Sequence, residues 1–350
     1  MTSNAVSQSN PAKTDVGSGF SLGSLLRRPE AGAFLGLMAV MIFFAVFGGI
    51  TFLQPAGMSS WLNVAANLGI IAIPVGLLMI AGELDISVGA MVPFGAMTVA
   101  VISGHSGMSI WLGIAVTLCF GVIVGLINGY LVIKTAVPSL IVTLGTLFAV
   151  QGIVLGLTVL ITKSTSVALK VEGPAKAIFG DFLAGGQLQV MVIWWLVLTA
   201  AYVFYVHLSP KGNWLFAMGG DKISARNAGI PTDRVTILLF VLSATSAAFV
   251  GMCQAILYNS AQVAGGQSFI FNSIISVVVG GVLLTGGFGS VIGIFFGTIT
   301  FAIVNQGIYY TDFDRNWSAL IIGVLLLGAV LMNNTFRKMA LSYSPKKGAK

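Results

Sequence analysis

The chain has 350 residues, of which 57% are hydrophobic and only 8% are charged, and its formal net charge is +7. A mean hydropathy of +0.98 excludes the charged surface of a water-soluble protein, so lipid is the expected environment of the chain. The basic residues are scattered among short connections and form no patch interleaved with aromatic residues, which argues against nucleic acid as a partner.

Ten apolar segments follow one another and predict an all-α, polytopic membrane protein of about ten transmembrane helices. The transmembrane domain is expected over residues 31–335, between a disordered cytoplasmic tail at 1–30 and a basic cytoplasmic tail at 336–350. The segment at 269–285 is short and ends in a glycine-rich stretch, so a broken or re-entrant helix is the alternative there. The predicted spans are 33–53, 64–82, 86–104, 111–133, 138–162, 190–208, 236–258, 269–285, 288–310 and 317–334.

The distribution of basic residues predicts that both termini are cytoplasmic, because lysines and arginines stay preferentially on that side. With ten spans, thirteen of the seventeen basic residues lie inside, and the outer connections hold Lys163, Lys170, Lys176 and Arg315. The longest outer loop, 163–189, is expected to offer a surface to an external partner.

The inner loop at 209–235 contains a predicted short helix at 221–228, which Asp221 caps and Gly229 ends. This helix either docks another protein or belongs to a solvated connection that obeys the preference for positive residues inside. Both interpretations stay open at this point.

Glu83 and Asp85 are the only charged residues between positions 54 and 104. The favoured interpretation is a polar turn at the inner membrane boundary, with Asp85 or Ser87 capping the next helix. In the alternative, both carboxylates line an aqueous cavity, where they contact substrate or relay protons.

Small and amide side chains recur inside the apolar segments. Two glycine triplets at a spacing of four predict close packing between helices of this chain: Gly121, Gly125 and Gly129, and Gly289, Gly293 and Gly297. Four carboxamides either hydrogen-bond a hydroxylated solute along a translocation path or bond neighbouring helices: Asn128, Gln151, Asn305 and Gln306.

Motifs for catalysis and cofactor binding are missing from the sequence. It contains no Gly-Lys dipeptide and hence no phosphate-binding loop of the G-x-x-x-x-G-K-[ST] kind, so any ATPase must be a separate chain. Its two cysteines have no metal-ligand spacing, and no hydrolase motif is present. We therefore expect a transport subunit that is not an enzyme and binds no cofactor or metal.

Three motifs in order resemble the ribose-type permeases of bacterial ABC sugar importers: GELDISVG at 82–89, VPSLIVTLGT at 137–146, and VVVGG at 277–281 followed by GGFGS at 286–290. The resemblance implies a fold similar to that of the cobalamin importer type, and a permease that works as a homodimer or heterodimer in the bacterial inner membrane. It further implies cytoplasmic ATP-binding subunits that hold ATP and Mg, and a periplasmic or tethered protein that delivers a monosaccharide or polyol.

The inner sequence GDKISARNAGI at 220–230 looks like the coupling loop of this family, which contacts the ATPase. The family pattern has two glutamates and two alanines before the arginine. Ala225, Arg226, Gly229 and Ile230 match the pattern, whereas Lys222, Ile223 and Ser224 depart from it. Glu83 also departs, because the resemblance implies a small residue before the LDIS stretch.

An ion-coupled secondary sugar or polyol carrier, with Glu83 and Asp85 as a proton relay, is the alternative to the ABC importer. A channel-like facilitator is a third and weaker interpretation.

Overall fold

Long apolar helices form most of the molecule, which a computed structural model describes over residues 29–331 apart from 136, 184, 185, 313, 318 and 329. The predicted tails at 1–30 and 336–350 lie outside the described residues, except for residues 29 and 30. Within this described part, eight helices are long and apolar enough to cross a membrane, and each overlaps one predicted span: Glu30–Phe47, Pro55–Ile80, Val88–His105, Ile110–Thr135, Ser139–Thr162, Met191–Leu208, Thr232–Tyr258 and Val291–Tyr310. The prediction of an all-α, polytopic membrane protein is thus confirmed.

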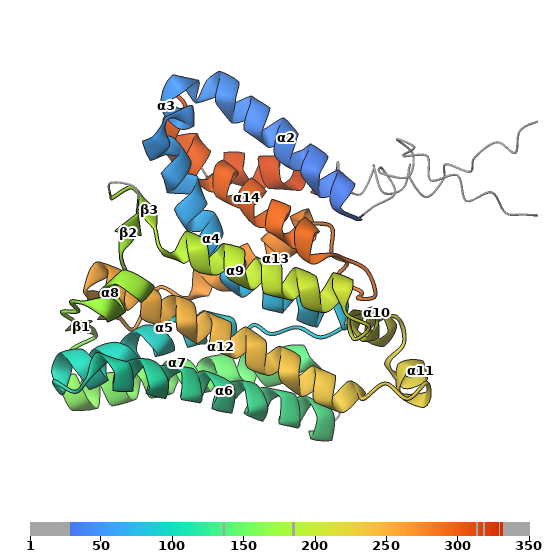
Figure 1. Ribbon diagram of the computed structural model, residues 1–350, viewed down its shortest axis with the longest axis horizontal. Helices are drawn as coiled ribbons and strands as arrows, with labels where there is room; N and C mark the ends of the chain where they lie inside the picture. Colours follow the sequence, from blue (N-terminus) through green and yellow to red (C-terminus); the bar gives the residue numbers. More distant parts are fainter. Residues whose placement is uncertain are drawn as a thin grey trace, which may run out of the picture.

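Figure 1 labels these helices by their α-helical parts. Three of them continue beyond those parts, through the π-helical turns Ala100–His105 and Phe204–Leu208 and the 3-10 turn Ile308–Tyr310. The labelled parts are α2 (Pro29–Phe47), α4 (Pro55–Ile80), α5 (Val88–Val99), α6 (Ile110–Thr135), α7 (Ser139–Thr162), α9 (Met191–Val203), α12 (Thr232–Tyr258) and α14 (Val291–Gly307). The short α3 (Gly49–Leu53) connects α2 to α4, and a 3-10 turn at Arg315–Trp317 follows α14.

The two remaining predicted spans contain shorter apolar helices. α13 (Gln267–Val279) has 13 residues and reaches about 20 Å, which is less than the ~30 Å of hydrocarbon in a bilayer. Residues 280–290 then turn irregularly until Ser290 caps α14 by accepting the Gly293 N–H at 2.9 Å. The span at 269–285 is therefore a broken helix, and the last predicted span contains the helix Ala319–Gly328.

α12 lies at the centre of the bundle, between a group formed by α5, α6 and α7 and a group formed by α2, α4, α9, α13 and α14 (Figure 1). The first glycine triplet lets α6 approach α12 closely, since a Cβ at Gly125 would lie 2.4 Å from the Val241 Cα. In the second triplet, a Cβ at Gly297 would lie 2.1 Å from the Ser276 carbonyl oxygen on α13. The first triplet packs between helices as predicted, and Gly293 and Gly297 do so on α14, whereas Gly289 lies in the irregular turn before that helix.

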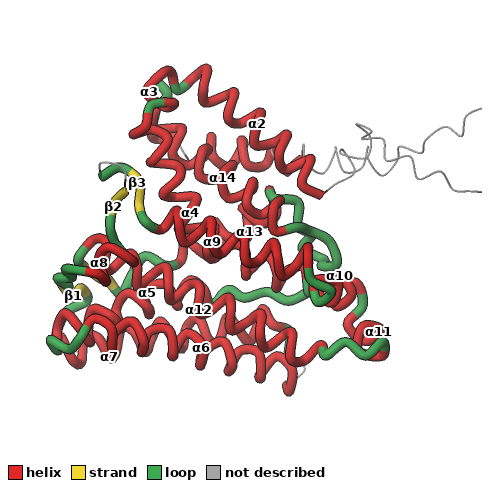
Figure 2. Tube along the Cα trace, viewed as in Figure 1, coloured by secondary structure: helices red, strands yellow, loops and turns green. Residues whose placement is uncertain are grey.

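Apart from residues 83–86, which run through the bundle, most non-helical connections lie at two opposite ends of it (Figure 2). At one end, β1 (Ser166–Ala168) pairs antiparallel with β4 (Ser260–Gln262), and β2 (Phe182–Leu183) pairs antiparallel with β3 (Leu188–Gln189). We call this the strand end; it also contains α8 (Pro174–Phe179). The opposite end, the α11 end, contains α10 (Gly212–Gly220) and α11 (Lys222–Asn227).

The loops 163–189 and 209–235 thus lie at opposite ends of the bundle, and their placement on opposite sides of the membrane stays a prediction. α2 also begins near the α11 end (Figure 1). The orientation of the two ends relative to the cytoplasm stays a prediction from the positions of the basic residues.

Candidate translocation pocket and coupling elements

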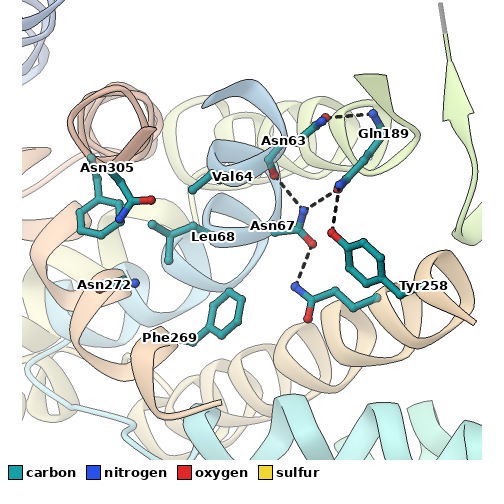
Figure 3. A pocket seen from close by; sticks show the side chains of 11 residues that line it. Asn63, Val64, Asn67, Leu68, Gln189, Tyr258, Phe269, Asn272 and Asn305 are labelled. Atoms are coloured by element: carbon teal, nitrogen blue, oxygen red, sulfur yellow. Dashed lines mark hydrogen bonds between the residues drawn. The ribbon is translucent and has the colours of Figure 1, made fainter. Parts of the chain in front are cut away.

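A pocket of about 190 Å³ lies near the strand end, where α4, β3, α12, α13 and α14 meet (Figure 3). Carboxamides from all five elements line it together with aromatic side chains. The lining residues are Asn63, Val64, Asn67, Leu68, Gln189, Gln254, Tyr258, Phe269, Asn272, Phe301 and Asn305. Among these described residues none carries a charge, so the pocket suits a neutral polar solute better than an ion.

Hydrogen bonds among the carboxamides tie α4 to β3 and to α12 (Figure 3). The Asn67 side-chain N–H donates to Gln189 Oε1 at 2.9 Å, and the Gln254 amide donates to Asn67 Oδ1 at 3.3 Å. The Gln189 backbone N–H donates to Asn63 Oδ1 at 2.9 Å. Carboxamides can both donate and accept, so the same groups can exchange these bonds for bonds to the hydroxyls of a solute.

Of the four predicted path residues, the structure brings only Asn305 to this pocket. Gln306 donates its side-chain N–H to Asn305 Oδ1 at 2.8 Å and supports it from the adjacent position. Asn128 is fully buried in another network, described below, and Gln151 lies on α7, away from the pocket lining. The interpretation of Asn128 as a bond to neighbouring segments is the one that the structure supports.

Five of the six pocket carboxamides were not predicted: Asn63, Asn67, Gln189, Gln254 and Asn272. Asn63 and Asn67 are four residues apart and hence share one helix face, a signal that the sequence contained. Their proximity to Gln189 and Gln254 could not be read from spacing, because those residues are more than a hundred positions away.

The chain between α4 and α5 is not the polar turn that was predicted at the inner membrane boundary. Residues 83–86 are irregular and run between helices from the α11 end toward the start of α5 (Figure 1). Asp85 in this segment is only 1% exposed, and its Oδ1 accepts from the Ser87 N–H at 2.9 Å and the Ser87 hydroxyl at 2.6 Å. Ser87 occupies the N-cap of α5 without a capping side-chain bond, so the predicted cap by Asp85 or Ser87 is wrong.

Polar side chains from α6 and α7 hold this 82–87 segment in place. The Leu84 N–H donates to Ser139 Oγ at 3.1 Å, and the Ile86 N–H donates to Thr143 Oγ1 at 3.3 Å. Asn128 donates to Ser87 Oγ at 3.0 Å. These bonds satisfy backbone and side-chain groups that would otherwise be buried without partners, which explains how an irregular segment is tolerated inside the bundle.

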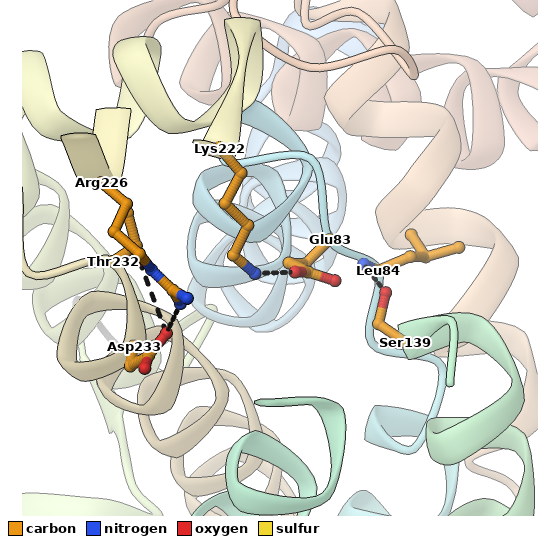
Figure 4. A network of polar contacts seen from close by, with 7 residues as sticks. All are labelled: Glu83, Leu84, Ser139, Lys222, Arg226, Thr232 and Asp233. Atoms are coloured by element: carbon orange, nitrogen blue, oxygen red, sulfur yellow. Dashed lines mark hydrogen bonds and ion pairs between the residues drawn. The ribbon is translucent and has the colours of Figure 1, made fainter. Parts of the chain in front are cut away.

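Glu83 at the start of the segment forms an ion pair with Lys222 of α11, with 2.5 Å between Oε1 and Nζ (Figure 4). The Glu83 side chain is 11% exposed and the Lys222 side chain is 34% exposed. The two residues are 139 positions apart. The pair therefore connects the α11 helix to the chain that leads to Asp85.

α11 begins and ends as the sequence predicts. Asp221 Oδ1 accepts the Ser224 N–H at 2.7 Å, and this bond lowers the pKa of the Asp221 carboxyl. Gly229 has φ of +87°, and its N–H donates to the Arg226 carbonyl at 2.9 Å. Ala225 is buried, and its carbonyl accepts the Ile230 N–H at 3.1 Å.

The Arg226 guanidinium does not extend freely from α11 toward a partner. It pairs with Asp233, and its Nε donates to Thr232 Oγ1 at 3.1 Å, so that α11 is held against the first turn of α12 (Figure 4). Ile223 is instead the most prominent apolar side chain of α11, at 75% exposure. Ser224 beside it is also exposed.

α10 contacts the end of α4 through glycine backbones. A Cβ at Gly219 would lie 1.8 Å from the Ile80 carbonyl oxygen and 2.3 Å from the Gly287 nitrogen. The same Ile80 oxygen accepts the Gly287 N–H at 2.8 Å. The ends of α4 and α10 and the irregular turn before α14 thus meet at one point, where no side chain larger than hydrogen fits at position 219.

Comparison with known proteins places these features in one family. The family described as "Branched-chain amino acid transport system / permease component" matches residues 57–330. A xylose/arabinose import permease protein of Sulfolobus acidocaldarius is 30% identical over 93% of this chain and 88% of its own length. A galactose/methyl galactoside import permease protein of Escherichia coli is 28% identical over 93% of this chain and 98% of its own length.

A fructose import permease protein of Rhizobium meliloti is 29% identical over 89% of this chain and 87% of its own length. No solved structure matches the chain. The expected likeness to the cobalamin importer fold therefore stays a prediction.

Proposed function

Because this chain belongs to the ABC-importer permease family that matches residues 57–330, as a multi-pass protein of the inner membrane, we propose that it transports a monosaccharide or related polyol. The names of its relatives support this substrate class, since the three import permeases named above are assigned to xylose or arabinose, galactose and fructose. The observation in the structure that carries the proposal is the uncharged pocket with six carboxamides.

The description of the family suggests a second substrate class, the branched-chain amino acids. An amino acid enters as a zwitterion, and burying its two charges requires partners of opposite charge. The described pocket lining offers carboxamides, one phenol and apolar groups instead. Carboxamides match hydroxyl groups as both donors and acceptors, and aromatic faces suit the apolar side of a sugar ring. The pocket thus favours a sugar.

ATP and Mg are bound by separate cytoplasmic ATPase subunits in this proposal, because the sequence has no phosphate-binding loop. α11 is the proposed docking helix. Asp221 and Gly229 fix its two ends, Arg226 holds it to α12, and Ile223 supplies an exposed apolar contact. A pair of permease chains and an external sugar-binding protein, docked at the strand end, complete the proposed assembly.

The proposal is tested by purifying the chain with its ATPase, supplying its external binding protein, and measuring uptake in proteoliposomes with a panel of pentoses, hexoses, polyols and branched-chain amino acids. ATP-dependent uptake of one sugar or polyol, with no uptake of leucine, isoleucine or valine, is the expected result. ATP-dependent uptake of a branched-chain amino acid would show that the substrate is an amino acid and not a sugar or polyol. Uptake by the chain alone, driven by a proton gradient, would overturn the proposal as a whole.

A further inference from the structure

Two residues that depart from the family pattern meet in the structure. Lys222 stands where the resemblance implies a glutamate, and Glu83 stands where it implies a small residue. A glutamate at position 222 would face Glu83 and repel it, whereas Lys222 forms an ion pair with it. The two departures are therefore complementary in charge and in position.

We propose that the Glu83–Lys222 ion pair is the link through which movement of α11 reaches the buried 82–87 segment and its hydrogen-bond network. This inference rests on the proposed function, because it assigns a role within ATP-driven transport. Glu83 and Lys222 are positioning residues here, and neither needs to touch the sugar or the nucleotide.

The connection from the ion pair to the bundle interior is short and continuous. Glu83 precedes Leu84, whose N–H is held by Ser139 of α7, and the chain then leads to Asp85 and Ser87. Ser87 Oγ accepts from Asn128 of α6, and Asn128 Oδ1 accepts from the Thr146 hydroxyl of α7 at 2.6 Å. The backbone that follows Glu83 is thus hydrogen-bonded to both α6 and α7, and a displacement of Glu83 is transmitted to these bonds.

The partial burial of Glu83 makes the pair more than a surface contact. Ion pairs between exposed side chains contribute little to stability. The Glu83 carboxylate is only 11% exposed and has lost most of its contact with water, so it depends on Lys222 as its charged partner. α10 cannot slide past the same point, because Gly219 is in backbone contact with Ile80. The end of α4 and the residues that follow it are therefore held by two contacts: the backbone contact of Gly219 on α10, and the ion pair of Lys222 on α11.

The test uses the complete transporter in proteoliposomes and compares wild type with Lys222→Glu, Glu83→Gln and the exchanged pair Glu83→Lys with Lys222→Glu. The readout is the number of ATP molecules hydrolysed per sugar imported, together with co-purification of the ATPase. Lys134→Glu is the matched control, since it reverses an exposed lysine at the same end of the bundle and outside the pair.

We expect Lys222→Glu to raise the ATP cost per sugar about tenfold, and the exchanged pair to return it to within about twofold of wild type. Glu83→Gln should give an intermediate value, and Lys134→Glu should match wild type. The ATPase should co-purify with every variant.

Two results would overturn the inference. If Lys222→Glu and Glu83→Gln both keep the wild-type ratio, the pair transmits nothing. If Lys222→Glu is impaired and the exchanged pair, though assembled, is not restored, Lys222 acts through another partner. Absence of ATP-driven uptake in wild type would instead contradict the proposed function, so the two failures are distinguishable.

Discussion

Replacing Gly229 by valine tests whether the shape of the α11 loop is needed for ATPase docking. Gly229 has φ of +87°, where a side chain costs about 1–3 kcal/mol and a β-branched one is least tolerated. A Cβ at this position meets no atom within 4 Å, so the whole effect is conformational. If docking requires the native turn, a penalty of that size weakens ATPase binding roughly 5- to 150-fold.

The assay is titration of the purified ATPase onto the permease in detergent or nanodiscs, followed by ATP-driven uptake. Gly229→Asn is the matched control, because asparagine adds a side chain at the same point and tolerates the left-handed conformation. We expect the asparagine variant to bind close to wild type. Equal binding of the valine and asparagine variants would refute the argument that backbone conformation at this residue controls docking.

Three further predictions concern the interior, the pocket and the topology. Asp85→Asn should keep the acceptor for both Ser87 bonds and retain most uptake. Asp85→Leu removes that acceptor and should lower the free energy of unfolding by about 1–3 kcal/mol. The measurement is thermal melting in detergent, and equal stability of the two variants would show that these bonds are dispensable. Asn67→Leu removes the side chain to which both Gln189 and Gln254 are hydrogen-bonded. It should raise the KM for sugar about tenfold in uptake assays, and an unchanged KM would show that this pocket does not bind the transported sugar. Cysteines at Lys170 and Lys211 should react with an impermeant reagent from opposite sides of the membrane, and reaction of both from outside intact cells would refute the topology.

The sequence predicts features of this protein that depend on neighbours along the chain. The lengths of the apolar segments located the eight long helices of the described residues. A membrane span needs a continuous run of apolar residues, and such a run is visible in the sequence alone. The Asp221 cap and the Gly229 turn are set by residues within four positions of each other. The first glycine triplet, together with Gly293 and Gly297 of the second, identified close-packed helix faces, though not their partners.

The features that the sequence did not predict depend on contacts between distant residues. Asp85 looked like a boundary residue because its neighbours include glycines and a serine, and only the position of α6 and α7 around it shows that it is buried. The pocket and the Glu83–Lys222 pair each join residues more than 120 positions apart. The sequence showed that Glu83 and Lys222 depart from the family pattern, and the structure supplied their proximity.

The central claim, that this chain imports a sugar only together with an ATPase, is tested most directly by uptake of labelled sugar into proteoliposomes. The vesicles contain the permease with its ATPase and are supplied with the sugar-loaded binding protein, with or without ATP on the ATPase side. We predict uptake only when ATPase, binding protein and hydrolysable ATP are all present. Equal uptake by the permease alone under a proton gradient would contradict the claim.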